Sequence, residues 1–194
     1  VQTWDHLYAV NKQTGVEFDD PIHRLYLLNK DASKIVYISE YNNQNTYRKR
    51  NNAWPGNDRE NGTIYINHKN INTVRLSIYS FINGDYEKSY SYWDENAEVN
   101  DINLPDPITL ADAKKANEEL VKNFTFDAAD EVGYPDYLEY DLWESKDVLS
   151  WWKFRMTRKS DGKKIVLPVH YIHGFDNEGK IINVTMYFNA SLMQ

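Results

Sequence analysis

Residues 151–189 read WWKFRMTRKSDGKKIVLPVHYIHGFDNEGKIINVTMYFN, and residues 4–43 read WDHLYAVNKQTGVEFDDPIHRLYLLNKDASKIVYISEYNN. A constant spacing of 147 residues joins identical pairs: Trp4 and Trp151, Lys12 and Lys159, Gly15 and Gly162, Pro21 and Pro168, His23 and His170. After a one-residue gap the match continues to Asn43 and Asn189. A repeated unit of this length predicts duplicated structure.

Each stretch has the pattern of an antiparallel meander. The cluster Ser160-Asp161-Gly162 separates two runs that are rich in aromatic and β-branched residues, as a hairpin turn does. The segment 176–179, Asp-Asn-Glu-Gly, predicts the next turn. Because successive side chains of a strand point to opposite faces, one face of the strand between the turns carries Ile165, Leu167, Val169, Tyr171 and His173. We therefore expect three long strands that share an apolar face.

The composition indicates a folded, acidic protein. Hydrophobic residues make up 41% and aromatic residues 14% of the 194 residues, enough for a core. A net charge of −7 gives no basic surface for nucleic acid or for an anionic membrane. The absence of cysteine excludes disulfides, thiol nucleophiles and the usual structural zinc sites. We expect no nucleic-acid partner and no membrane insertion, and the compartment stays open.

The region between the two stretches predicts a polar connection followed by helices. Residues 44–66 show no period and are expected to form a linker or an exposed loop. From Asn67 apolar residues at helical spacing predict a helix that stops at Asn83-Gly84, and Asp85 can cap a short second helix reaching Trp93. Residues 97–101 read as a strand, Thr109 predicts a helix N-terminus, and residues 134–143 read as extended.

This order of elements resembles the nuclear transport factor 2-like superfamily, and within it the SnoaL-like proteins. The resemblance rests on FINGDY at 81–86, WDENAEVND at 93–101 and FDNEGKI at 175–181, and it covers residues 67–194. It implies an α+β cone, in which a strongly curved antiparallel sheet wraps around N-terminal helices and leaves a pocket between the layers. Since no phosphate loop, activated serine motif or metal-ligand spacing is present in the sequence, we expect no cofactor and no metal.

The resemblance also suggests what residues 1–43 form. Residues 1–43 are predicted to be the C-terminal meander of a partial first copy of such a domain. Three explanations remain open: a longer tandem protein of which this chain is a trimmed piece, a strand-rich arm that covers a sheet edge or a partner, or chance convergence. We favour the tandem, because half a cone would expose apolar surface, and a start at Val1 rather than Met fits removal of an N-terminal segment.

Alternation also selects the residues that should line the pocket. These are Leu167, Val169, Val184, Met186 and Phe188, with Trp93 and Tyr90 near the mouth. Asp101 ends the strand across from them. A carboxylate beside apolar walls is desolvated, which raises its pKa toward the range of a general base.

The resemblance implies roles for three residues. Val99-Asn100-Asp101 is similar to the segment that carries the general base of ketosteroid isomerases, although the proline follows only at Pro105. Tyr171 falls at the place of one oxyanion donor, and Ser77 replaces a tyrosine at the other. SnoaL-type cyclases use a His and Asp pair, which implies His173 with Asp101 as a proton shuttle. The structural alternative is a histidine bonded within the sheet and an aspartate that caps a turn.

Three functions therefore remain in view. The first is binding of a small apolar molecule, the default for such a pocket. The second is a cofactor-free isomerase, cyclase or dehydratase that uses Asp101 with His173 or Tyr171. The third is an oligomerisation module, a homo-oligomer formed through the outer sheet face that carries Val166, His170 and Ile172.

Overall fold

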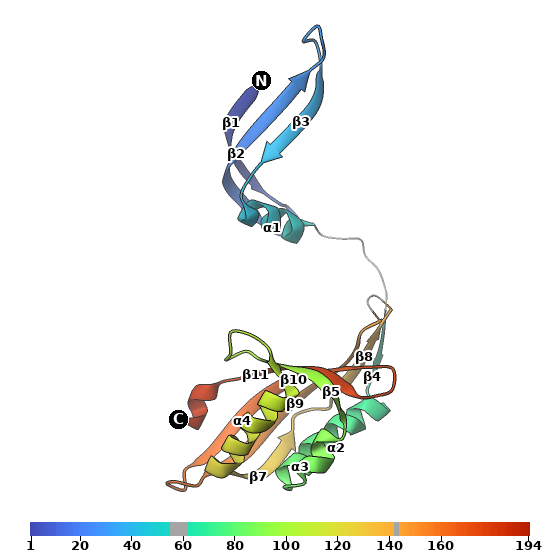
Figure 1. Ribbon diagram of the computed structural model, residues 1–194, viewed down its shortest axis with the longest axis vertical. Coiled ribbons are helices and arrows are strands. Elements are labelled where there is room, and N and C mark those ends of the chain that lie inside the picture. Colours follow the sequence, from blue (N-terminus) through green and yellow to red (C-terminus); the bar gives the residue numbers. More distant parts are fainter. Residues whose placement is uncertain (55–61, 142–143) are drawn as a thin grey trace. The chain divides into compact units, whose positions relative to one another are not determined.

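The computed structural model describes residues 1–54, 62–141 and 144–194. The chain divides into two compact units, Val1–Arg59 and Glu60–Gln194 (Figure 1). Each unit has its own sheet, and each is described by itself.

The first unit is a three-stranded antiparallel sheet with one helix. Strands β1 (Gln2–Val10), β2 (Glu17–Leu28) and β3 (Ile35–Tyr41) lie in that order, and helix α1 (Gln44–Ala53) follows β3 (Figure 1). Asn43 caps α1 by accepting the backbone N–H of Thr46 at 2.9 Å. Phe18 and Ile22 of β2 are buried in this unit.

The expected linker over residues 44–66 is wrong at both ends. Residues 44–53 form α1, and Gly62–Tyr65 forms strand β4 of the second unit. The helix has no apolar period, and two ion pairs join it to the sheet: Lys49 pairs with Asp20 of β2, and Arg50 pairs with Glu40 of β3. A polar segment can thus be a packed helix when its charges find partners.

The described residues of the second unit form an eight-stranded sheet and three α-helices. In chain order its elements are β4 (Gly62–Tyr65), α2 (Lys69–Ile82), α3 (Tyr86–Tyr90), β5 (Trp93–Asp101), β6 (Ile108–Thr109), α4 (Leu110–Asn123), β7 (Phe124–Glu131), β8 (Asp136–Tyr140), β9 (Lys146–Arg158), β10 (Lys164–Phe175), β11 (Ile181–Phe188) and a short 3₁₀ helix (Ala190–Met193). The sheet order is β4-β8-β9-β10-β11-β5-β6, and β7 also pairs with β9.

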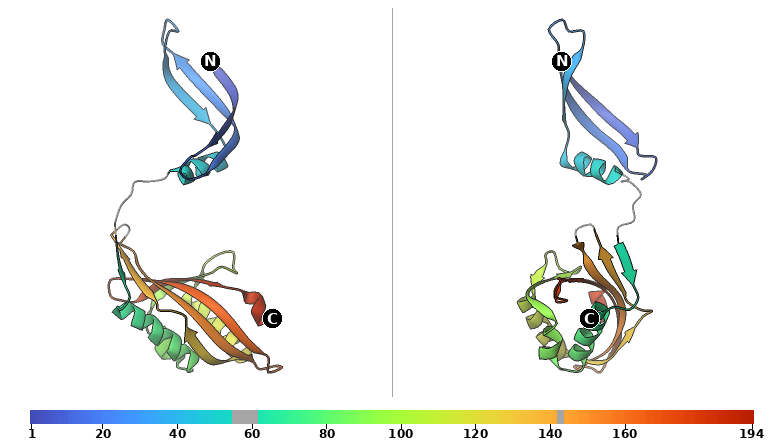
Figure 2. Two further views of the ribbon diagram at one scale, coloured as in Figure 1. Left: turned by 180° about the vertical axis from the view of Figure 1, so that it is seen from behind. Right: turned by 90° about the vertical axis from the view of Figure 1, so that its right-hand side faces the viewer.

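The sheet curves around the helices, which confirms the expected α+β cone (Figure 2). One detail differs from the expectation of an antiparallel sheet: β5 runs parallel to β11, so the sheet is mixed. The remaining pairs are antiparallel, and the long β9 and β10 form the wall of the cone.

Short polar side chains set the helix starts as predicted. Thr109 Oγ1 accepts the backbone N–H of Asp112 and donates to its carboxylate at 2.9 Å, which begins α4. Asp85 caps α3 by accepting the N–H of Lys88. The sequence predicted that the second helix reaches Trp93. In the structure Trp93 is instead the first residue of β5. Strand β7 was not predicted from the sequence.

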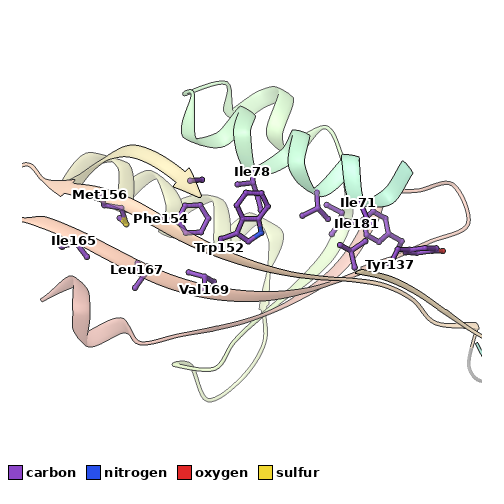
Figure 3. Close-up of a cluster of buried hydrophobic side chains, with 14 residues drawn as sticks. Ile71, Ile78, Tyr137, Trp152, Phe154, Met156, Ile165, Leu167, Val169 and Ile181 are labelled. Carbon is purple, nitrogen blue, oxygen red and sulfur yellow. The ribbon is translucent and has the colours of Figure 1, made fainter. Parts of the chain in front are cut away.

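The core lies between α2 and the concave side of β9, β10 and β11. Figure 3 shows Ile78 of α2 beside Trp152 of β9, and Ile71 of α2 beside Ile181 of β11. Burying one such side chain stabilises the fold by about 1.5–3 kcal/mol. This layer packs α2 against the sheet.

The two meanders match in strand register. Trp4 lies opposite His23 in the first unit, and Trp151 lies opposite His170 in the second. The register of β2 with β3 shifts between Leu27 and Leu28, and that of β10 with β11 shifts between Gly174 and Phe175. These two irregularities are separated by the same spacing as the repeated residues.

The matched positions carry the same ring stack. In the first unit His23 stacks between Trp4, at 4.4 Å, and Tyr41, at 5.4 Å. In the second unit His170 stacks between Trp151, at 4.9 Å, and Tyr187, at 5.7 Å. The turns also agree, since Gly15 and Gly162 have φ values of 71° and 74°, a region that favours glycine.

Candidate functional site

A cavity of about 400 Å³ lies in the second unit between the sheet and the helices. Pockets for small molecules measure about 300–1,000 Å³, so its size suits one such ligand. The cavity borders every residue that the sequence suggested for a pocket: Leu167, Val169, Val184, Met186, Phe188, Trp93, Tyr90, Asp101, Tyr171 and His173. Apolar side chains make up most of its wall.

Helix α4 and strand β9 contribute lining residues that the sequence reasoning missed. Ala113, Asn117 and Leu120 come from α4, and Phe154 and Met156 come from β9. The sequence could have predicted the two strand residues, because they alternate with Arg155 and Thr157 along an apolar face. It could not have predicted Asn117, since an asparagine on an amphipathic helix is expected to face solvent.

Strand pairing puts the polar residues into two rows. Asp101, Met186 and Tyr171 are neighbours across β5, β11 and β10. Val99, Val184 and His173 form the adjacent row on the same face. Asp101 therefore shares a row with Tyr171, while His173 lies diagonally from it.

Asp101 lies at the half-exposed rim of the cavity. Its Oδ1 accepts the backbone N–H and the side-chain Nδ2–H of Asn103, both at 2.8 Å. Within the described residues no hydrogen bond joins Asp101 to His173 or Tyr171. The carboxylate thus organises the turn after β5, and it is not enclosed by apolar walls as the sequence suggested.

Tyr171 is partly buried, His173 is fully buried, and both side chains favour their neutral forms. Burial lowers the pKa of His173 to about 3, so the imidazole is neutral at pH 7. Burial, with a smaller contribution from the charge of Asp101, raises the pKa of the Tyr171 phenol. The two rings lie 5.2 Å apart, and Trp93 meets His173 edge-on at 6.1 Å. A proton shuttle at His173 near neutral pH does not fit this environment.

The burial of His173 favours one tautomer. Its Nδ1 is buried and has no hydrogen-bond partner in the described parts of the chain. A buried N–H without an acceptor is rarer than a buried acceptor without a donor. We therefore place the proton on Nε2, which makes that atom a hydrogen-bond donor.

The other polar groups on the cavity wall bond to one another. Ser77 Oγ donates to the carbonyl of Ser89 at 3.2 Å and accepts from Trp93 Nε1 at 3.0 Å. Tyr90 Oη accepts from Asn117 Nδ2 at 3.0 Å, and burial raises the pKa of that tyrosine. Ser77, at the helix position where the family resemblance expects a tyrosine, is thus already engaged.

Charged groups are scarce at this site. Among the residues that the structure describes, no lysine or arginine borders the cavity, and Asp101 is its one carboxylate. The same residues contain no group of three or more His, Asp or Glu side chains arranged to hold a metal ion. Nor does any helix in the described ranges have the length and apolar character needed to cross a membrane.

The outer face of the sheet carries the residues expected for assembly. Val166 is exposed there, and His170 Nδ1–H donates to the backbone carbonyl of Ser150 at 3.1 Å. His170 also lies inside the ring stack with Trp151 and Tyr187. Self-association through this face stays a prediction.

Comparison with known proteins places the fold. No family model and no curated protein sequence matches the chain. Among solved structures, a “putative isomerase” from Bacillus subtilis aligns over 64% of this chain and 88% of its own, at 16% identity and a TM-score of 0.53. A “putative polyketide cyclase” from Xanthomonas campestris aligns over 66% and 95%, at 14% identity and a TM-score of 0.50.

A “putative hydroxylase” from Streptomyces galilaeus aligns over 64% of this chain and 92% of its own, at 12% identity and a TM-score of 0.50. At such identities the likeness concerns the fold and not the chemistry. The second unit therefore shares the fold of these solved structures, and this fold is the α+β cone that the sequence resemblance predicted.

Proposed function

We propose that the second unit binds a small, neutral, largely apolar molecule in its cavity. The observation that supports this most directly is the combination of an apolar wall with two neutral polar groups on it, Tyr171 and His173. An apolar pocket with a few convergent polar groups is the usual form of a small-molecule site.

The charge of the lining argues for a neutral ligand. An anion would lose its hydration without gaining a cationic partner, because no lysine or arginine borders the cavity among the described residues. The same anion would also approach Asp101 at the rim. A cation could reach Asp101 only at the half-exposed edge, and its deeper part would face apolar carbon.

The polar groups argue for a hydrogen-bond acceptor on the ligand. The Tyr171 hydroxyl can donate, and so can Nε2 of His173 in the tautomer assigned above. A ketone, ether or ester oxygen can accept from either group. Each such bond contributes about 0.5–1.5 kcal/mol of affinity.

A thermal-shift screen with neutral apolar compounds tests the binding function. A ligand that binds only the folded state raises the melting temperature. Val169→Phe should reduce the response, because Val169 is buried on the cavity wall. Val166→Phe, on the exposed outer side of the same strand, is the matched control and should respond like the natural chain. A library without hits, or equal responses from both variants, would contradict the proposal.

A second candidate function is supported by the row of Asp101, Met186 and Tyr171. We propose as the alternative a cofactor-free isomerase, cyclase or dehydratase in which Asp101 removes a proton and Tyr171 donates to the developing oxyanion. The proteins with similar folds include a “putative isomerase” and a “putative polyketide cyclase”.

Proton exchange distinguishes the two candidates. A ketone such as 2-acetylnaphthalene is incubated with the protein in D₂O, and exchange of its α-protons is followed by proton NMR. Catalysis predicts accelerated exchange that is lost in Asp101→Asn while ketone binding persists. If the ketone binds but its α-protons exchange no faster than in buffer alone, the result would support the binding function. It would contradict the enzymatic function for ketones.

A further inference from the structure

The clearest unexplained feature outside the cavity is the exposed apolar surface of β3. Ile35 is 54% exposed and Ile38 is 52% exposed. Their counterparts by the sequence repeat, Ile181 and Val184 of β11, are 0% and 3% exposed. Both positions keep an apolar β-branched residue, although in the first unit these side chains face solvent.

The second unit shows what covers these positions. The edge of β11 that does not face β10 pairs in parallel with β5, where Val184 lies opposite Val99 and Thr185 lies opposite Asn100. Val99 and Val184 pack together in one buried cluster. In the described part of the first unit, β3 pairs with β2 alone. Its other edge therefore presents unpaired backbone groups beside two exposed isoleucines.

We propose that the free edge of β3 is a docking site for one extended strand that runs parallel to β3 in the register of β5 on β11. The matched ring stacks, turns, pairing registers and register shifts of the two meanders support this transfer of register. Backbone hydrogen bonds would supply affinity, and alternate side chains would supply specificity, as in other cases of strand addition. The proposal is independent of the cavity and of the function proposed for it.

The neighbouring side chains define the chemistry of the incoming strand. Beside Ile38 it needs an apolar residue, as Val99 is beside Val184. Two residues further along it meets Glu40, which stands where β11 has Met186. Glu40 already binds Arg24 at 3.1 Å and also pairs with Arg50. A second carboxylate like Asp101 would be repelled by Glu40, so this position of the strand should be neutral or basic.

Disulfide trapping tests both orientation and register, because the natural chain has no cysteine. Ser39→Cys marks the outer side of β3 at the position that corresponds to Thr185. The probe is a synthetic peptide with the sequence of residues 93–101 that carries Asn100→Cys and Asp101→Lys. Directly opposed residues of paired strands have a Cα separation that a disulfide can span.

We expect this peptide to cross-link to the Ser39→Cys chain about 10-fold more efficiently than a peptide with Asn96→Cys in place of Asn100→Cys, which would lie out of register. A chain with Thr14→Cys, in the exposed turn between β1 and β2, is the control for random oxidation. Adding Ile38→Glu should abolish the preference, and adding Tyr37→Glu, at the exposed neighbouring residue on the opposite face of β3, should retain it.

Three results would overturn the proposal. Equal trapping of the two peptides would mean that no parallel register exists. Trapping no greater than in the Thr14→Cys control would mean that the edge does not accept this strand. A Ser39→Cys disulfide dimer that excess peptide does not compete away would mean that a second copy of the chain occupies the edge.

Discussion

The N-terminal cap of α2 depends on the protonation state of His68. Its Nδ1 accepts the backbone N–H of Asn70 at 3.2 Å and so caps α2. The imidazole also stacks on Tyr137, with ring centroids 3.9 Å apart. Burial and the charge of Lys69 lower the pKa of His68, and Glu139 opposes that shift. The folded state therefore favours the neutral ring.

The first prediction concerns pH. Because the folded pKa of His68 is below its unfolded value of about 6.5, the stabilisation is complete above that pH and is lost as the pH falls toward the folded pKa. Protection of the first-turn amides of α2 against hydrogen exchange should thus decline below pH 6.5. His68→Asn, a cap that does not titrate, should remove the decline. The same decline in both proteins would assign it to other groups.

The second prediction concerns Tyr171 and uses three ligands of one shape. If Tyr171 or His173 donates to the ligand, 2-acetylnaphthalene should bind more tightly than 2-isopropenylnaphthalene, and 2-naphthoate should bind most weakly. Tyr171→Phe should weaken the ketone about 2- to 10-fold, the value of one hydrogen bond, and leave the alkene unchanged. Calorimetric titration measures all three. Equal affinities for ketone and alkene in the natural chain would refute the donor role without refuting the pocket.

At the scale of elements, α4 depends on the cap that the sequence revealed. Thr109 bonds the backbone and the carboxylate of Asp112, and α4 then supplies Ala113, Asn117 and Leu120 to the cavity wall. Thr109→Ala should lower the free energy of unfolding of the second unit by about 1 kcal/mol. Urea unfolding followed by circular dichroism measures this change. Thr109→Ser keeps the oxygen and should stay near the natural value; equal losses in both variants would argue against the cap.

Helix α1 should respond to salt differently. Its contacts with the sheet include the ion pairs of Lys49 with Asp20 and of Arg50 with Glu40. At 1 M salt the Debye length falls to about 3 Å, which weakens partly exposed pairs. We expect amide exchange in α1 to accelerate with salt more than exchange in α4. Lys49→Gln should reduce this salt response, whereas an unchanged response would show that apolar contacts hold the helix.

Local sequence patterns predicted the strands with alternating apolar residues and the helices with polar N-terminal caps. Alternation located the cavity side of β10 and β11, and short polar caps located the starts of α3 and α4. Strand β7 was not predicted because it is acidic, and its acidic residues pair with cations on β9 and β10, Asp130 with Arg155 and Asp127 with Lys164. The position of Asp101 beside Tyr171 depends on the parallel register of β5 with β11, which no local pattern encodes.

At the scale of the whole molecule, the outer sheet face of the second unit is the surface on which we predict self-association. Val166, Trp151 and Tyr187 are exposed large side chains on this face, and His170 lies between the two rings. A stable interface buries about 1,200–2,000 Å² and concentrates aromatic residues near its centre. The ring stack provides such a centre without requiring any buried charge.

The mass of the protein in solution, measured by light scattering coupled to gel filtration, tests this prediction. The chain has a mass of 22.9 kDa, and we expect the natural protein to elute with the mass of a dimer. Val166→Glu should convert it to the monomer, because two carboxylates would be brought together at an isologous interface. Leu192→Glu adds the same charge at an exposed position on the 3₁₀ helix and should leave the dimer intact. A natural chain that elutes at 22.9 kDa would contradict assembly through this face, and a dimer that persists in Val166→Glu would place the interface elsewhere.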